Sequence, residues 1–368
     1  MLTMHPTVLV GPADWDPVRL PQAEFAARLA AFWGHCDPAI AGAMVFGGPH
    51  HHAELAWLTH FTPKLEGAIA LIPRAGAPRL LVGGGANMLG AAKPLTWVET
   101  LLPLRDAGTT IARWHDEIGG LALVNGDAMP FGLRQSIDAA LGAAPLDATA
   151  LVTEAMRRKS SRELAMIREA CAGLDAALSA MYDAQRTRMA LSDVVLAGER
   201  AARQRGAQDV RTLFGREGRL APFTALDQAI ADPLQVYVAV RQDGYWAEGF
   251  AALSQSALPA AEQARATLTE ALRLIGPGAP YRAPAELLAR EVGAGRMHPV
   301  TRNGFGGPMG LALDAPECLT TASRGHFAAR EVFSLRVGLQ GDGGAAVVSA
   351  MIVITETGHD VLWPGATP

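Results

Sequence analysis

Three side chains in the second half of the sequence are of types, and in surroundings, that suit acid–base chemistry and anion binding. Glu248 alternates with Trp246 and Phe250, so its carboxylate shares a strand face with two aromatic rings and can serve as a general acid or base. Arg336 stands alone in the apolar segment VFSLRVGL, where a guanidinium that faces a core needs a partner. Tyr237, within VYVAV, points away from its flanking valines and can direct its hydroxyl into a cleft.

Each of these residues also has a plainer interpretation. Arg336 can be a strand residue that faces solvent, Glu248 can be a solvated residue on a sheet edge, and Tyr237 can be an aromatic side chain of the core. The residue pattern alone leaves these alternatives open.

Further candidates surround glycine-rich segments. His298 and Arg302, in MHPVTRNGFGG, are candidate substrate contacts. The run His50–His52 favours a solvated loop or a contact with a partner subunit over a metal site, because adjacent residues of one loop seldom converge on an ion. The segments GGGANMLG and GFGGPMG lack the strand, loop and helix context of a dinucleotide-binding motif, so we expect no nucleotide cofactor.

Hydrophobic spacing and Gly/Pro punctuation predict the elements of the first half. Phe25, Leu29 and Phe32 recur at helical spacing and predict a helix over 22–35. The segment GAMVFGG is typical of a buried strand, and GAIALIPRAGAPRLLVGGG of two short strands joined by a turn. This half therefore predicts an α/β domain, which we bound at residues 1–153.

The second half, residues 154–368, has a different pattern. Ser160 and Glu163 form a capping-box signature at the start of a long amphipathic helix whose apolar stripe includes Cys171. A second helix follows, then a loop, and then a hairpin that turns at the Asp-Gly pair of VYVAVRQDGYWAEGFAAL. Two more helices, a glycine-rich loop and two terminal strands complete the segment, which predicts an α+β layered domain.

Composition bounds the function classes. The 368 residues predict about two domains, and 49% hydrophobic against 18% charged residues predicts compact folding. The net charge of -4, from mixed signs, argues against nucleic-acid and anionic-membrane partners and favours small molecules or peptides. The three cysteines are scattered and form no C-x-x-C pair, which argues against disulfides and structural zinc and fits a cytoplasmic protein. We expect neither an export signal nor a membrane span.

Several segments, in order, resemble those of the creatinase, prolidase and aminopeptidase P family. LAWLTHFTPKLEGAIALIP resembles the family's x-x-Leu-Thr-Gly-Phe segment, and Arg158 to Glu163 resembles Arg-x-x-Lys-Ser-x-x-Glu. DGYWAEGFAAL, GFGGPMGLALDAPE and the two terminal strands resemble the segments that follow. The resemblance implies an α/β N-terminal domain plus an α+β pita-bread C-terminal domain (creatinase/aminopeptidase-like), a homodimer, and a small-molecule substrate.

The resemblance also implies where metal ligands would stand. Hydrolytic members place two Asp, one His and two Glu around two divalent ions that activate water. In this chain those positions hold, in order, Tyr237, Glu248, Gly307, Arg336 and Ser349. One carboxylate remains, and a cation would repel Arg336 by ~4 kcal/mol for unit charges 4 Å apart in a dielectric of about 20. We therefore expect no metal site and no cofactor, and an ion pair of Arg336 with Glu248 in its place.

Other positions that the resemblance singles out are altered as well. Phe223 stands where the family has a catalytic His after a Pro, and Asp314 stands where it has a second His. These two residues and Ser349 are candidate lining residues of a substrate cleft. His60 and Lys64, in LTHFTPK, occupy a region that reaches toward the neighbouring subunit's cleft in family dimers and are candidates for binding a substrate anion.

Three functions follow from these observations. The first is a metal-independent enzyme of hydrolase or lyase type that acts on a small amino-acid-like or amide/guanidino substrate. In it Glu248 is the acid or base, Arg336 holds a carboxylate or a developing anion, and Tyr237 donates a hydrogen bond. The alternatives are a non-catalytic pseudopeptidase with a binding or scaffold role, and a metal-dependent Xaa-Pro peptidase whose ligands stand elsewhere.

Overall fold

The structure is a computed structural model that describes residues 14–64, 66–84, 86–187, 190–216, 219–223, 230–313, 315–316, 318–341 and 344–364. The chain divides into two compact units between Arg157 and Arg158. The last helix before this point packs against earlier helices of the N-terminal unit, and the helix after it packs on strands of the C-terminal unit.

The N-terminal unit is built on a mixed sheet with strand order β4-β3-β2-β1-β5-β6. Its strands are β1 (Gly42–Gly47), β2 (Ala68–Pro73), β3 (Arg79–Val82), β4 (Thr100–Pro103), β5 (Leu121–Val124) and β6 (Leu146–Asp147). Its helices are α1 (Gln22–His35), α2 (Ala53–Thr59), α3 (Ala86–Ala92), α4 (Ala107–Ile118), α5 (Phe131–Leu141) and α6 (Thr149–Arg157). The predicted helix over 22–35 and the predicted strands are confirmed.

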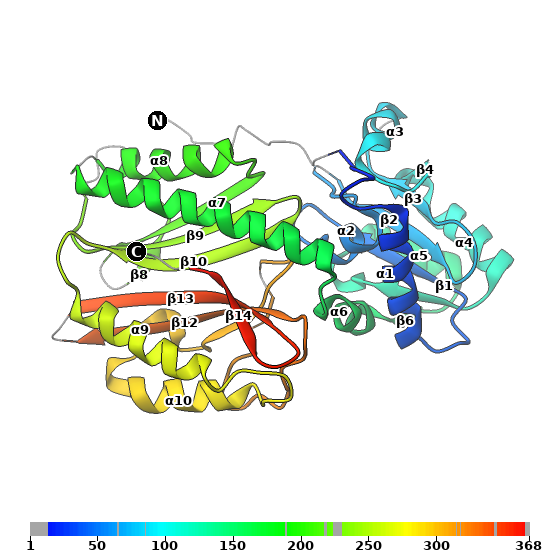
Figure 1. Ribbon diagram of the computed structural model, residues 1–368. Helices are drawn as coiled ribbons and strands as arrows, with labels where there is room; N and C mark the ends of the chain where they lie inside the picture. Colours follow the sequence, from blue (N-terminus) through cyan, green and yellow to red (C-terminus); the bar gives the residue numbers. More distant parts are fainter. Residues whose placement is uncertain are drawn as a thin grey trace. The chain divides into compact units, whose positions relative to one another are not determined.

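The core of this unit follows from the alternation of apolar residues along β1. Met44 and Phe46 face α4 and α5, where they meet Ile111, Trp114 and Ile137. On the other face α2 packs on β1, and α1 packs on α2 and α6 (Figure 1). Helices thus cover both faces of the sheet, as the α/β prediction requires.

The C-terminal unit contains two sheets with strand orders β10-β9-β7-β8 and β11-β12-β13-β14. The first sheet has β7 (Asp209–Arg216), β8 (Arg219–Ala221), β9 (Leu234–Gln242) and β10 (Tyr245–Leu253). The second has β11 (Gly306–Pro308), β12 (Val332–Gly341), β13 (Gly344–Ile354) and β14 (His359–Trp363). The helices are α7 (Ser161–Arg186), α8 (Leu191–Gln204), α9 (Pro259–Leu272), α10 (Arg282–Val292) and the short 3-10 helix η5 (Pro299–Thr301).

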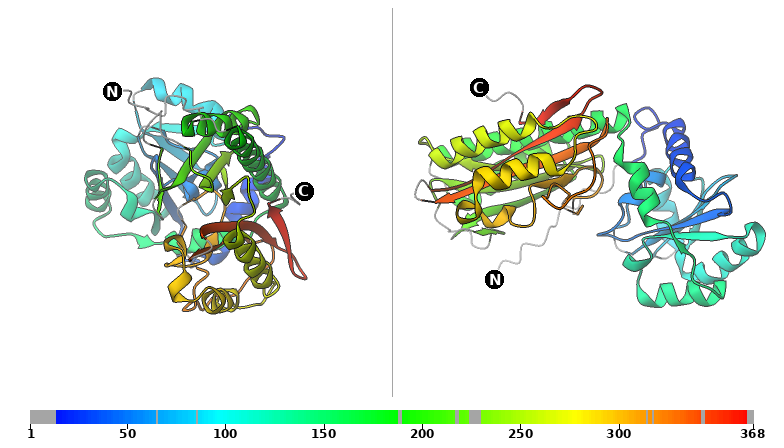
Figure 2. Two further views of the ribbon diagram at one scale, coloured as in Figure 1. Left: turned by 90° about the vertical axis from the view of Figure 1, so that its left-hand side faces the viewer. Right: turned by 90° about the horizontal axis from the view of Figure 1, so that it is seen from below.

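Within this unit the two sheets lie between two helical layers. Helices α7 and α8 lie over the sheet of β9 and β10, and α9 and α10 lie over the sheet of β12 and β13 (Figures 1 and 2). On β12, Phe333, Leu335 and Val337 join the core under α9 and α10. The alternate residues of the same strand, Ser334 and Arg336 among them, therefore point toward the space between the sheets.

Helix α7 begins where the sequence predicts. Ser160 Oγ accepts a hydrogen bond from the Glu163 N–H at 3.1 Å, and Glu163 Oε2 accepts one from the Ser160 N–H at 2.9 Å, which together form a capping box. Cys171 lies in the buried stripe, as predicted. Although α7 spans 26 residues, no helix within the described ranges has the length and apolar run that crossing a bilayer needs.

One sequence expectation is wrong. We expected a loop between the second helix of this unit and the strand of Tyr237, and the structure has β7 there. The segment pairs with β9 in antiparallel register, with Leu213 opposite Tyr237. Its apolar alternation is short and is interrupted by Arg211 and Gly215, so it is difficult to recognise without the neighbouring strand.

Candidate functional site

The turn between β9 and β10 determines which side chains share a face. Its residues Asp243–Gly244 have positive φ angles of 48° and 86°, as a two-residue hairpin turn requires. The resulting register places Phe250 opposite Tyr237, and it places Glu248 opposite Ala239, one pair further along the same face. Because directly opposed residues of antiparallel strands point the same way, the Tyr237 phenol and the Glu248 carboxylate lie side by side.

Strand β7 adds a third column to this face. Arg211 lies opposite Ala239, and Leu213 lies opposite Tyr237. A row of Arg211, Ala239 and Glu248 therefore crosses the three strands. The methyl group of Ala239 leaves room above it for the longer side chains on either side.

The second sheet contributes a guanidinium from the opposite wall. Arg336 Nε donates a hydrogen bond to the Val300 carbonyl oxygen of η5 at 3.3 Å, and its Cζ lies 5.7 Å from the centre of the Phe250 ring. Gly307 of β11 pairs with Ser334 of β12 and brings bare backbone to the same space.

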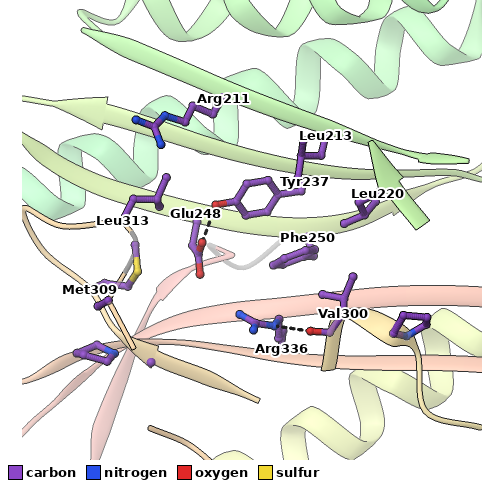
Figure 3. A pocket seen from close by; sticks show the side chains of 14 residues that line it. Arg211, Leu213, Leu220, Tyr237, Glu248, Phe250, Val300, Met309, Leu313 and Arg336 are labelled. Atoms are coloured by element: carbon purple, nitrogen blue, oxygen red, sulfur yellow. Dashed lines mark hydrogen bonds between the residues drawn. The ribbon is translucent and has the colours of Figure 1, made fainter. Parts of the chain in front are cut away.

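These residues line an open cavity of about 700 Å³ (Figure 3). This volume is within the usual range for small-molecule sites, and the wall is largely apolar with a few charged groups, as such sites generally are. It is lined by Arg211, Leu213, Leu220, Tyr237, Glu248, Phe250, Pro299, Val300, Gly307, Pro308, Met309, Leu313, Ala315 and Arg336.

A carboxylate and a phenol form the polar centre of the cavity. The Tyr237 hydroxyl donates a hydrogen bond to Glu248 Oε2 at 2.8 Å, and the Glu248 side chain is 8% exposed. Burial, and then the adjacent Glu248 charge and hydrogen bond, raise the pKa of Tyr237, against a smaller opposite effect of Arg336 and Arg211. The phenol therefore stays protonated at neutral pH and presents its proton to the carboxylate.

Ser349 and Met351 support this centre from behind. Ser349 Oγ accepts a hydrogen bond from the Phe250 N–H at 2.8 Å, and Met351 Sδ accepts one from the Glu248 N–H at 3.2 Å. Ser349 is 4% exposed and lies beside the β10 backbone, outside the cavity lining. It thus anchors the strand that carries Glu248.

His298 has a comparable supporting position. His298 is 3% exposed, and its Nδ1 accepts a hydrogen bond from the N–H of Val300, a lining residue, at 3.2 Å. Burial, and then the charge of Arg302, lower the pKa of His298. Arg302 itself is exposed, and neither residue belongs to the cavity lining.

The remaining candidates lie elsewhere. Phe223 is half-buried after β8 and does not line the cavity. Asp314 falls outside the described residues; its sequence neighbours Leu313 and Ala315 line the cavity. His60 and Lys64 belong to the N-terminal unit, where His60 ends α2 with a φ of 64° and its Nδ1 lies 3.1 Å from the Leu95 carbonyl oxygen. Their substrate contacts stay predictions.

Sequence reasoning did not identify Arg211. It lines the cavity with its guanidinium Cζ 4.8 Å from the centre of the Trp246 ring. The signal that could have identified it is the alternation in DVRTLF, which assigns Arg211 and Leu213 to one face of a strand.

Solved structures of peptidases share this fold. The prolidase of Pyrococcus horikoshii OT3 matches with a TM-score of 0.74 and 14% identity, over 92% of this chain and 97% of its own. The chain has the pita-bread fold of the Xaa-Pro peptidases. The dipeptidase PepE of Mycobacterium ulcerans matches with a TM-score of 0.74 and 19% identity, over 97% of this chain and 98% of its own. A zinc-substituted aminopeptidase P of E. coli in complex with product matches at 0.76 with 15% identity over 96% of each.

The sequence itself matches no protein-family model and no curated protein. At these identities the structural likeness shows the fold alone. It confirms the predicted fold class, and the resemblance on which that prediction rested.

Metals would fit poorly among the side chains that stand at the expected ligand positions. Gly307 has no side chain, Arg336 brings a positive charge, and the Tyr237 phenol is protonated. The Ser349 hydroxyl is engaged with backbone, which leaves the Glu248 carboxylate as the anionic group of this set. Within the described ranges no three His, Cys, Asp or Glu side chains gather as a metal site would need.

Proposed function

We propose that this protein is a metal-independent enzyme of hydrolase or lyase type that acts on a small amino-acid-like molecule with an amide or guanidino group. The observation that carries the proposal is the hydrogen-bonded Tyr237–Glu248 pair in a cavity that also contains Arg336. A buried carboxylate held by a protonated phenol and accompanied by a guanidinium is a suitable arrangement for proton transfer beside a developing negative charge.

The hydrolytic form of the reaction assigns one task to each group. Glu248 accepts a proton from a water molecule whose oxygen attacks the carbonyl or amidine carbon. With an amide, Arg336 stabilises the negative charge that develops on the carbonyl oxygen, and with a guanidino substrate it holds the substrate carboxylate, while Tyr237 orients Glu248. The proton on Glu248 then passes to the leaving nitrogen as the carbon–nitrogen bond breaks, so the carboxylate is regenerated.

The test uses metal-stripped protein and a panel of probes: creatine, guanidinoacetate, N-acetyl amino acids and amino-acid amides, with products followed by mass spectrometry. We expect one probe class to be turned over in the presence of a chelator. Glu248→Gln should lower that rate by about 100-fold or more, because it removes the proton acceptor. Glu262→Gln, on the exposed face of α9, is the matched control and should leave the rate unchanged.

Two other functions would give different results. If the protein only binds its ligand, Glu248→Gln will change affinity without any turnover to abolish. If it is a metal-dependent Xaa-Pro peptidase, it will cleave an Ala-Pro dipeptide with added manganese and lose this activity on chelation. The latter result, or two stoichiometric divalent ions in the purified protein, would reject metal independence.

The assembly and the compartment are part of the same proposal. A homodimer and a cytoplasmic location are expected from the family resemblance and from the scattered cysteines. Sedimentation of the purified protein at a monomer mass would reject the dimer.

A further inference from the structure

Among the described residues, Arg211 has one charged partner close to its guanidinium, Asp209. Its charge is shared with Asp209, but Nε and Oδ2 are 3.5 Å apart, and the two side chains are 49% and 41% exposed. That separation is longer than a good hydrogen bond, and a pair so open to water contributes little. The Trp246 ring, 4.8 Å from Cζ, holds the guanidinium plane against the strand.

The position of Arg211 differs from that of Arg336. Figure 3 shows the two guanidiniums on opposite sides of the Tyr237–Glu248 pair. Both are close enough for their charges to oppose the rise in the pKa of Tyr237. The charged groups among the described lining residues are therefore two cations and one carboxylate, an excess of one positive charge.

Apolar side chains fill much of the wall around these groups. Leu213 and Leu220 come from the first sheet, and Phe250 and Val300 lie nearer Arg336. An apolar wall of this kind favours a ligand with a hydrocarbon body, which removes its surface from water on binding.

We propose that Arg211 is the anchor for a permanent substrate anion, and that the substrate is a monocarboxylate with an apolar body, such as an N-acylated apolar amino acid. This inference rests on the proposed function and deepens it. The planar fork of Arg211 pairs with the carboxylate, which leaves Arg336 for the charge that develops during the reaction.

The experiment is isothermal titration calorimetry on the full chain with two matched probes, N-acetyl-L-leucine and N-acetyl-L-leucinamide. We expect the acid to bind about tenfold more tightly than the neutral amide, as a partly exposed, charge-assisted hydrogen-bonded pair provides. Arg211→Gln should remove this preference, and Arg211→Lys should retain part of it because the charge remains. Added salt should weaken binding of the acid more than binding of the amide.

Arg273→Gln is the matched control, since it removes the same charge from an exposed position at the end of α9. It should leave the preference intact. Equal affinity of the two probes for the wild-type protein, undetectable binding of the acid, or an unchanged preference in Arg211→Gln would each overturn the inference. Circular dichroism of each variant establishes that it is folded.

The same titration separates this inference from the proposed function. Glu248→Gln should bind the acid at least as tightly as the wild type, because it removes a negative charge from the cavity. If Arg211→Gln removes the preference for the acid but no probe is turned over, the proposed enzymatic function is rejected and the role of Arg211 as an anion anchor is kept. If a probe is turned over and Arg211→Gln changes neither its turnover nor the preference for the acid, the anchor role of Arg211 is rejected and the proposed enzymatic function is kept.

Discussion

Tyr237 connects the chemistry of the cavity to the stability of the protein. Because the pKa of this phenol is raised, the folded state keeps a proton that the unfolded state releases above a pH of about 10. The free energy of unfolding should therefore fall as the pH rises through and beyond that value. In Tyr237→Phe this part of the alkaline loss should vanish, as urea unfolding at pH 8 and at a pH above 10 would show.

The same substitution leaves Glu248 without its hydrogen-bond donor, and we expect it to cost about 1–3 kcal/mol at neutral pH. Tyr182→Phe, on a partly exposed tyrosine of α7, is the control. An alkaline loss in Tyr237→Phe equal to that of the wild type would refute the assignment.

His298 gives the opposite dependence on pH. Its pKa is lowered by burial and by Arg302, so on acidification the unfolded state binds a proton that the folded ring resists. The free energy of unfolding should fall as the pH drops below the ordinary histidine value near 6.5. His298→Asn, whose side-chain oxygen can accept the Val300 N–H in place of Nδ1, should flatten this dependence in denaturant titrations.

His326→Asn is the companion control, since His326 is exposed. If the free energy of unfolding of both variants falls with acidification as it does in the wild type, the burial of His298 does not cause that fall.

The candidate site divides into residues that a sequence can identify and residues that it cannot. The family resemblance assigned Tyr237 and Glu248 to a cleft, whereas the residue pattern alone left other positions open for both, and in the structure both line the cavity. The two-residue turn and the register of the hairpin bring them to one face. Arg336 is also in the lining, whereas its predicted ion pair with Glu248 stays a prediction. Arg211 was not predicted, because we expected a loop where β7 lies; the alternation in DVRTLF is a weak signal, and the place of Arg211 in the site depends on the non-local pairing of β7 with β9.

The start of α7 links the helix to the hairpin of the site. Glu163 completes the capping box and its Oε1 also accepts the Tyr245 hydroxyl at 2.9 Å. Ser160→Ala should lower the free energy of unfolding by about 1 kcal/mol in chemical denaturation. Ser161→Ala, one residue further along and exposed, should have almost no effect, and an equal loss in both would argue against the cap.

The pairing of β11 with β12 depends on a glycine. Gly306 has a φ of 139°, and a Cβ there would collide with the Ser334 carbonyl oxygen. We expect Gly306→Ala to destabilise the protein by more than about 3 kcal/mol and to weaken binding in the cavity, because Gly307, Pro308 and Met309 would move with it. Thermal unfolding and calorimetry with N-acetyl-L-leucine would measure the two effects.

Gly341, at the other end of β12, is the matched position, since a Cβ there would meet nothing within 4 Å. Gly341→Ala should leave both measurements nearly unchanged. Equal losses in the two variants would contradict a special role of Gly306.

Elements whose formation depends on neighbouring residues in the sequence were predictable, and the strand that depends on a distant pairing partner was not. The cap of α7, the Asp243–Gly244 turn and the predicted helix over 22–35 depend on residues a few positions apart, and all three are confirmed. Strand β7 was missed because its partner β9 begins about twenty residues later, so its pairing is non-local.

The division of the chain at Arg157 and Arg158 assigns the entire cavity lining to one unit. Residues 158–368 expressed alone should therefore unfold cooperatively and retain the preference for N-acetyl-L-leucine over its amide. Denaturation followed by circular dichroism, and calorimetry, would check this. A folded fragment that binds neither probe would show that residues before Arg158 are needed for binding.

Gln235 links the two sheets of that unit with a single amide. Its Nε2 donates to the carbonyl oxygens of Val347 at 3.0 Å and Ala251 at 2.9 Å, while its Oε1 accepts the Val347 N–H at 2.8 Å. The side chain thus pairs with the Val347 backbone as a peptide group would, and it connects β9 to β13. Sliding of one sheet over the other would break both hydrogen bonds to Val347, so Gln235 helps to hold the two strands in their relative position.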